Sequence, residues 1–175
     1  MMTGEGGSGT ITLKVGVYMG YIEELRSLIG TRPVNLVGST VILTDGQGRI
    51  LLQRRTFPPG KWGLPGGLME LGESAEETGR REVKEETNLE VGRLKLVNVY
   101  SGQDQYIEAE NGDQFYSVTI CFHSEEFEGQ LKLQRSEGTK LEFISPKNLP
   151  DHMVASHRRM VADFLEKKSN QKDGA

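Results

Sequence analysis

The sequence is poor in the residues that carry sulfur or imidazole chemistry: among its 175 residues there are one cysteine and three histidines. A single cysteine, Cys121, excludes an internal disulfide and is typical of a reducing cytoplasm. Cys121 lies in an alternating, strand-like run, which favours a buried thiol over a nucleophile. The histidines (His123, His152 and His157) are scattered and make no zinc pattern. We therefore expect a cytoplasmic protein whose chemistry uses neither disulfides nor zinc.

Long hydrophobic runs are missing as well. No run of eighteen apolar residues occurs, which excludes a transmembrane helix, and the first residues lack a basic-then-apolar signal pattern. The formal net charge of −4 argues against long nucleic acid as the main partner. With 35% hydrophobic residues, the chain can bury one core but hardly two. These features together predict a single domain without a membrane partner.

The ends of the chain differ in composition from its middle. Residues 1–18 begin with a glycine-rich stretch and are interpreted as an N-terminal tail, in which residues 11–18 have the pattern of an added strand. Residues 19–170 are interpreted as one domain, and residues 171–175 as a disordered tail. A homodimer that exchanges the added strand and a monomer both stay open. Three methionines remain candidates for the start: Met1, Met2 and Met19.

The pattern of apolar residues and turns predicts an α+β domain with helices flanking a mixed sheet. The expected strands are residues 34–44, 49–55, 89–101, 115–123 and 141–145. The expected helices are residues 21–29, the segment between Ser74 and Asn88, and residues 151–167. Residues 45–48, Asp-Gly-Gln-Gly, are a strong hairpin signal between the first two strands.

The segment between Ser74 and Asn88 has clear helix ends. Ser74 is a natural N-cap, and Glu77 three residues later completes a capping box. Asn88 suits the left-handed position that follows the last turn. Within the helix, Glu82, Glu85 and Glu86 fall at i, i+3, i+4 spacing, which places three like charges within one arc.

Two of these glutamates point the same way as the apolar residues. The helix has one plausible buried stripe, formed by Ala75, Gly79, Val83 and Leu89. Glu82 and Glu86 share that stripe, so they are not part of an ordinary solvated face. Carboxylates turned inward are costly unless they are paired or bound to metal. A bound divalent cation is the best reason for the cluster.

The spacing around this helix resembles the Nudix box, G-x5-E-x7-R-E-U-x-E-E-x-G-U, where U is a bulky aliphatic residue. Gly67, Glu73 and residues 81–89 (REVKEETNL) match it, with one departure: Asn88 stands where the pattern has glycine. Asn tolerates a left-handed backbone, so we expect the turn to survive. The resemblance implies the Nudix α/β/α sandwich and a Mg²⁺ cofactor, for which Mn²⁺ can substitute.

The resemblance also implies roles for the box residues. Glu85 and Glu86 are the first-choice metal ligands, Glu82 is a ligand or the base for water, and the carbonyl of Gly66 or Gly67 completes the shell. Glu73 and Arg81 are expected to form a structural ion pair that fixes the loop against the helix.

Some Nudix enzymes place an additional glutamate, as base or ligand, on a downstream loop. Glu137 matches that position, and an exposed loop glutamate is the alternative.

The candidate substrate contacts lie outside the box. Arg54 and Arg55 end a strand that faces the box in the family layout, and arginine can hold phosphate in a bidentate manner. For Arg55, the alternative is a charged residue that ends the strand and serves only solubility. The aromatic candidates for a base or sugar pocket are Trp62, Tyr106, Phe115 and Tyr116. Aromatic residues at such positions are more often core residues, and a core or hinge role is the favoured alternative for Trp62.

The resemblance implies a Mg²⁺-dependent hydrolase that cleaves the pyrophosphate bond of a nucleoside diphosphate linked to another moiety. That substrate is a nucleoside triphosphate, a nucleotide sugar or a dinucleoside polyphosphate. The next proline beyond the box is Pro146, too distant for the ADP-ribose subclass, and Tyr106 is a weak marker of dinucleoside polyphosphate hydrolases. Two alternatives are a nucleotide sensor that does not cleave and an RNA 5′-pyrophosphohydrolase. The intact glutamates disfavour the sensor, and Arg54, Arg55 and Lys61 are too few for RNA.

Overall fold

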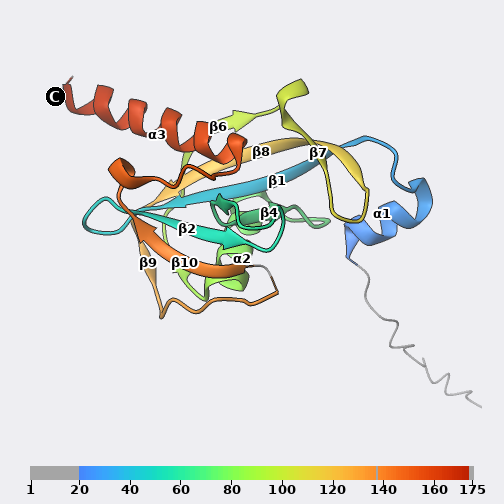
Figure 1. Ribbon diagram of the computed structural model, residues 1–175, viewed down its shortest axis with the longest axis horizontal. Coiled ribbons are helices and arrows are strands. Elements are labelled where there is room, and N and C mark those ends of the chain that lie inside the picture. Colours follow the sequence, from blue (N-terminus) through green and yellow to red (C-terminus); the bar gives the residue numbers. More distant parts are fainter. Residues whose placement is uncertain (1–19, 137, 174–175) are drawn as a thin grey trace, which may run out of the picture.

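The computed structural model describes residues 20–136 and 138–173 (Figure 1). The expected tail, the strand at residues 11–18 and Glu137 lie outside these ranges. The helices are α1 (Tyr21–Ile29), α2 (Ala75–Thr87) and α3 (Ala155–Asp173), with 3-10 turns η1 (Gln103–Gln105) and η2 (Pro146–Asn148). The strands are β1 (Val34–Leu43), β2 (Ile50–Arg55), β3 (Trp62–Gly63), β4 (Gly66–Leu68), β5 (Glu90–Val91), β6 (Lys95–Tyr100), β7 (Tyr106–Glu108), β8 (Gln114–Ser124), β9 (Phe127–Glu128) and β10 (Gly138–Ile144).

The largest sheet is mixed and has the strand order β4-β1-β8-β6, with β7 also paired to β8. Strands β1 and β8 run parallel over ten residue pairs, from Val34 with Phe115 to Leu43 with Ser124. The other pairs in this sheet are antiparallel. Because β1 is paired on both edges near its middle, β4 is fixed beside it, and β4 carries the glycines of the box.

A second sheet, antiparallel, has the order β10-β2-β3. The prediction that the first two strands pair as a β-hairpin is therefore wrong, because β1 and β2 lie in different sheets. The turn itself forms, because the Asp45 carboxylate accepts from the backbone N–H groups of Gln47 and Arg49. Beyond the turn, a single bridge joins Thr44 to Ile50, and β1 and β2 then diverge into different sheets.

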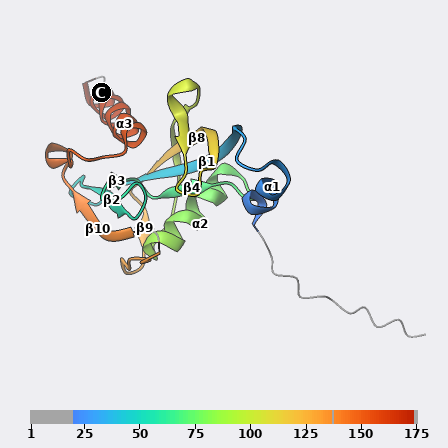
Figure 2. The same cartoon turned by 45° about the vertical axis from the view of Figure 1, so that its right-hand side comes forward.

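Two hydrophobic clusters lie on opposite faces of the sheets, and β1 contributes to both because successive strand residues alternate. Ile42 packs in the cluster under α3, which includes Met160 and Phe164. Val41 and Leu43 pack in the cluster under α2. Helices α2 and α3 accordingly cover opposite sides of the sheet (Figure 2). The expected α+β sandwich, a mixed sheet flanked by helices, is confirmed.

Several element boundaries differ from the prediction. The strand expected at residues 89–101 is two strands, because the chain turns at Gly92, whose N–H donates to the Glu126 carbonyl, and β5 pairs with β9 instead. The last helix begins at Ala155, not 151, since the preceding residues bridge to β3 through Trp62 and Met153. It continues to Asp173, past the expected domain end at residue 170. Among the described residues no helix is long and apolar enough to cross a membrane.

Candidate active site

Helix α2 begins and ends where its local signals place it. The Ser74 hydroxyl accepts from the Glu77 N–H, and the Glu77 carboxylate accepts from the Ser74 N–H at 2.8 Å. Asn88 closes the helix in the left-handed conformation, with a φ of 63°. Gly79 faces β1, where an added Cβ would lie 3.0 Å from the Ser39 hydroxyl oxygen. The helix is thereby held close against the sheet, and its inward glutamates meet β4.

Glu73 and Arg81 form a bidentate ion pair. The Arg81 Nε donates to one Glu73 oxygen at 2.6 Å, and its Nη2 donates to the other at 2.9 Å. The same carboxylate accepts from the Glu70 N–H and the Thr78 hydroxyl. Hydrogen bonding to Arg81 lowers the pKa of Glu73 to about 2. The loop that precedes α2 is therefore tied to the middle of the helix.

Arg81 also reaches the other glutamates of the cluster. Its Nη1 donates to Glu82 at 2.8 Å and to Glu85 at 3.2 Å, and its Nη2 donates to the Leu68 carbonyl. These contacts raise the pKa of Arg81, with the hydrogen bonds to Glu73 as the largest cause. One guanidinium thus contacts three carboxylates. Its positive charge offsets part of the repulsion among the glutamates that the helical spacing predicts.

Glu86 is the most deeply placed carboxylate of the cluster. Its residue is 3% exposed, and its Oε2 accepts from the Gly66 N–H at 3.0 Å. Glu85 differs, since its side chain is 57% exposed. The inward orientation that the helical pattern predicts is therefore observed for Glu86, while Glu85 lies on the rim.

Glu82 lies directly against the backbone of Gly67. A Cβ added to Gly67 would lie 2.5 to 2.7 Å from all three atoms of the Glu82 carboxylate group. Glycine is required for this close approach of backbone to side chain. Glu82 and Glu86 thus meet two consecutive residues of β4, Gly67 and Gly66.

The donor set suits a hard cation. Carboxylate and carbonyl oxygens are the ligands that Mg²⁺ prefers. Within residues 20–136 and 138–173, no three His, Cys, Asp or Glu side chains already stand in an arrangement that could hold a metal. The Nη1 of Arg81 donates to both Glu82 and Glu85. The residues fit Mg²⁺ by chemistry and by convergence on β4, with Arg81 as the competing cation.

A distant segment closes the C-terminal end of α2. The carbonyls of Glu86 and Thr87 accept from the N–H groups of Gln134 and Lys132. These carbonyls belong to the last turn of the helix and would otherwise lack partners. Gln134 in turn accepts from the Gly138 N–H. The described residues on either side of Glu137 are therefore tied to α2, directly or through Gln134, while Glu137 itself lies outside the described residues.

The two arginines of β2 are placed differently. Arg54 is exposed, whereas Arg55 is half-buried and its Nε donates to the Phe57 carbonyl at 3.1 Å. Trp62 packs against the cluster under α3, and the Lys140 ammonium lies 5.8 Å from its ring centroid. This placement favours a packing role for Trp62.

The other aromatic candidates lie at the far end of the large sheet. Tyr106 and Tyr116 pack with ring centroids 5.4 Å apart, and Phe115 is half-buried next to them in β8. Tyr116 is the register partner of Asn35, which lines a cavity of about 250 Å³. The same cavity is bordered by Glu70 and Glu73. Neither tyrosine lines this cavity, and no contact joins the tyrosine pair to Glu86 among the described residues.

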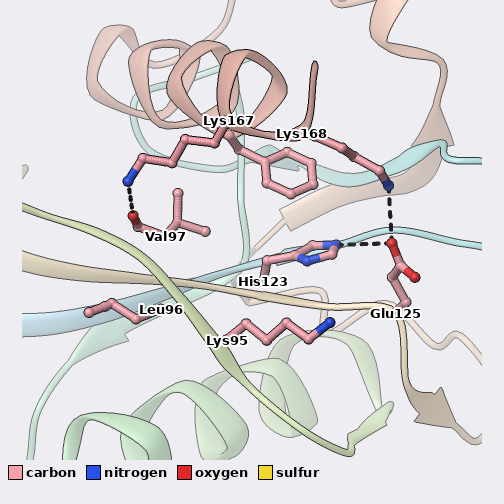
Figure 3. A pocket seen from close by; sticks show the side chains of 8 residues that line it. Lys95, Leu96, Val97, His123, Glu125, Lys167 and Lys168 are labelled. Carbon is pink, nitrogen blue, oxygen red and sulfur yellow. Dashed lines mark hydrogen bonds and ion pairs between the residues drawn. The ribbon is translucent and has the colours of Figure 1, made fainter. Parts of the chain in front are cut away.

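A second cavity, of about 170 Å³, lies on the α3 side of the sheet (Figure 3). His123 forms its centre, Lys95 approaches from β6, and Lys168 from α3 pairs with Glu125 at 3.0 Å. Burial lowers the pKa of His123 to about 4, and its Nε2 lies 2.8 Å from the Thr44 hydroxyl oxygen. No residue of the carboxylate cluster lines this cavity, so it is separate from the candidate site.

Sequence reasoning missed Gln53 of β2. Its side chain is fully buried, and neither amide atom has a hydrogen-bond partner among the residues that the structure describes. The available signal was a single glutamine at an inward position of the strand ILLQRR, two residues after Leu51. A buried amide at such a position requires a partner, and the sequence offers none at a fixed spacing.

Comparisons with known proteins agree with this geometry. The model of the NUDIX domain matches residues 34–164. A protein of Bacillus subtilis (strain 168) named "Putative 8-oxo-dGTP diphosphatase" is 33% identical over 124 residues, which cover 71% of this chain and 75% of that protein. An ADP-ribose pyrophosphatase of Methanocaldococcus jannaschii is 31% identical over 129 residues, which cover 73% of this chain and 72% of that protein.

A solved structure has the same fold. The crystal structure of a MutT NUDIX hydrolase from Burkholderia pseudomallei superposes with a TM-score of 0.64 and 26% identity, covering 74% of this chain and 98% of that chain. The matched residues 34–164 include β4, α2 and every described residue of the carboxylate cluster. The chain therefore belongs to the Nudix family of pyrophosphohydrolases.

Proposed function

We propose that this protein hydrolyses the pyrophosphate bond of a nucleoside diphosphate derivative and that it uses Mg²⁺. The observation that carries the proposal is the convergence of two inward glutamates, Glu82 and Glu86, on the backbone of Gly66 and Gly67. Inward carboxylates beside a glycine pair form an oxygen-rich site of the kind that Mg²⁺ favours. A diphosphate needs such a cation, because its own charge repels a carboxylate cluster.

The strand register favours Gly66 over Gly67 as the source of the carbonyl ligand. The bonded pairs Val41–Pro65 and Val37–Met69 flank the pair Ser39–Gly67 two residues away on each side. Backbone groups of alternate residues in an antiparallel ladder face the partner strand, so those of Gly67 face β1. The groups of Gly66 face away from β1, as its N–H bond to Glu86 requires.

Each residue of the cluster then has a role. Glu86, Glu85 and the Gly66 carbonyl are the proposed ligands, and Glu82 is a ligand or the base that removes a proton from water. Glu137 remains the alternative base. Arg81 orients Glu82 and links it to Glu73. A bound Mg²⁺ lowers the pKa of water and neutralises charge on the phosphates.

The substrate is proposed from the two relatives. A nucleoside triphosphate is the first candidate, because the Bacillus subtilis relative carries the name of a triphosphate hydrolase. ADP-ribose is the second, from the Methanocaldococcus jannaschii relative, although the expected proline beyond the box is absent from this sequence. Arg54, exposed at the end of β2, is the proposed phosphate contact.

The test is hydrolysis of a substrate panel in the presence of Mg²⁺, of Mn²⁺ and of chelator. The panel includes 8-oxo-dGTP, the common nucleoside triphosphates, ADP-ribose, nucleotide sugars and dinucleoside polyphosphates. The key variant is E86Q, whose amide oxygen can still accept from Gly66 while the charge is lost. We expect at least a roughly 100-fold fall in kcat for E86Q, since even residues that merely support a metal ligand contribute 10–100-fold.

The matched control is E76Q, an exposed glutamate on the outer face of the same helix. It should retain the activity of the parent protein. Metal-dependent cleavage that survives E86Q would show that the ligand assignment is wrong. Tight nucleotide binding without cleavage of any panel member would instead favour the sensor function.

A further inference from the structure

Gln53 has an unusual environment for a buried side chain. It is 0% exposed, and both its Nε2 and its Oε1 lack partners among the described residues. An amide of this kind offers two donor hydrogens and two acceptor lone pairs. Buried polar groups in native proteins are nearly always hydrogen-bonded, so a side chain with both ends open requires an explanation.

The neighbouring strands leave room for this amide. Gln53 is the register partner of Gly63 on β3. On the other side, a Cβ added to Gly138 of β10 would lie 2.8 Å from Gln53 Cγ and 3.0 Å from its Cδ. Glycine inside a strand weakens the strand and often marks a place where another group approaches closely. Both flanking strands thus provide a glycine beside the same glutamine.

Three connections link Gln53 to the elements that carry the carboxylate cluster. Leu51 lies two residues earlier on the same strand face and packs in one cluster with Val83 of α2. The chain after Gly63 leads within three residues to Gly66, whose N–H binds Glu86.

The third connection runs through β10. Gly138 donates to the Gln134 carbonyl, and Gln134 donates to the carbonyl of Glu86. Gly138, which flanks the Gln53 amide, is therefore linked to the backbone of Glu86 through one intermediate, Gln134.

We propose that Gln53 is a positioning residue of this site, whose amide is completed by water of the hydrated cation. Its Oε1 accepts from a water molecule of the Mg²⁺ shell, and its Nε2 donates to a second water molecule of the site. Mg²⁺ retains several waters when it binds to protein carboxylates, and those waters need acceptors. An amide supplies an acceptor and a donor without adding charge. This inference rests on the proposed function.

The test compares Q53M with the parent protein in two measurements. Methionine has nearly the same length and shape but no hydrogen-bonding groups. In chelator, Q53M should unfold at an equal or higher temperature, because an amide without partners has nothing to lose when it is replaced by an apolar group. Titration with Mn²⁺, followed by the EPR signal of the free ion, should show cation binding weakened about 10–100-fold, as for other groups that support metal ligands.

Two control variants make the result specific. L51M changes the volume on the same strand face and should leave the Mn²⁺ affinity unchanged. Q105M removes another buried glutamine. The side-chain atoms of Gln105, unlike those of Gln53, are not among the buried atoms without partners, so Q105M should lower the unfolding temperature. Steady-state kinetics of Q53M should show a raised Mg²⁺ activation constant in addition to any fall in kcat.

Each contrary result has a separate meaning. A lower unfolding temperature of Q53M in chelator, with unchanged Mn²⁺ affinity, would show that the amide is structural and would overturn the inference. Equal stability and equal affinity would show that the amide binds an ordinary buried water and would also overturn it. If the parent protein itself binds no Mn²⁺, the proposed function fails, and this failure is recognised because the titration is flat before any variant is compared.

Discussion

Arg81 connects parts of the site that have different roles. Its guanidinium donates to Glu73 in the loop, to Glu82 and Glu85 on the helix, and to the Leu68 carbonyl on β4. A planar group with five donors in a fixed fork can make this set of bonds, whereas an ammonium cannot. The geometry of the carboxylates therefore depends on the shape of this side chain as well as on its charge.

We expect R81K to reduce kcat by about 10–100-fold, although the charge is retained, because the fork that orients Glu82 and Glu73 is lost. The measurement is steady-state hydrolysis of the best panel substrate together with thermal unfolding. R93K, a change of the same kind elsewhere on the chain, is the control and should behave like the parent protein. Full activity in R81K would mean that charge alone is sufficient.

Gly67 gives a second prediction for a single residue. In G67A, the added methyl would overlap the Glu82 carboxylate, which is the mobile end of a side chain and can move away. We therefore expect a small change in unfolding temperature but a roughly 100-fold loss of kcat, since small displacements of reacting groups have effects of that size. G46A, where a Cβ would meet nothing within 4 Å, is the control. Equal losses in both variants would contradict the overlap.

At the scale of elements, α2 was predictable because its signals are local. Ser74, Glu77 and Asn88 mark its ends within the sequence, and the structure has the same ends. Short strands such as β3, β5 and β9 contain two residues each, which is too few for any periodicity to be read. Their existence depends on partners that are distant in sequence. The same reason explains the wrong hairpin, since β1 and β2 each find better partners elsewhere.

In the candidate site, too, the features set by local spacing were predictable and those set by distant contacts were not. The inward direction of Glu86 follows from helical spacing and is observed. The missing partners of Gln53 could not be predicted, because they depend on what three strands bring together. Likewise, the contacts of Arg81 with Glu82 and Glu85 depend on side-chain directions that spacing does not specify.

Helix α2 gives a prediction about stability. S74A removes the hydroxyl that accepts from the Glu77 N–H, and loss of an N-cap costs about 1 kcal/mol. For a domain of this size that corresponds to a fall of roughly 2–4 °C in Tm. Differential scanning calorimetry measures it. S169A, which removes an exposed serine inside α3, should shift Tm by much less; a fall as large as that of S74A would argue against the cap.

At the scale of the whole molecule, two histidines link the fold to pH. Leu64 donates its N–H to Nδ1 of His157 at 2.9 Å, so that atom must be unprotonated. Desolvation, with a smaller effect of Arg55, lowers the pKa of His157 to about 3. Burial lowers the pKa of His123 to about 4, against the opposing effect of the Glu125 carboxylate. Both imidazoles are neutral in the folded protein at pH values where the unfolded chain is already protonated.

Stability should therefore be highest above pH 6.5 and should fall as the pH decreases, through the window from about 6.5 to about 4 for His123 and to about 3 for His157. The unfolded state binds protons in this window that the folded state does not, so protonation favours unfolding. Urea unfolding at pH 7, 6, 5 and 4 measures the change. H157Q should reduce the slope, whereas H152Q, at an exposed position, should leave it unchanged. A stability that rises toward pH 5 would contradict this account.

The parallel pair of β1 and β8 sets the order in which the molecule can be completed during synthesis. The two strands pair along their full common length, yet the whole box, from Gly67 to Leu89, lies in the chain between them. A ribosome therefore releases the residues of α2, including the cap residues Ser74 and Asn88, before the strand that completes the sheet has been made. Contacts so distant in sequence form late, because a long loop must first be closed. The newly made chain thus contains the box carboxylates for some time before it has the sheet that completes their surroundings.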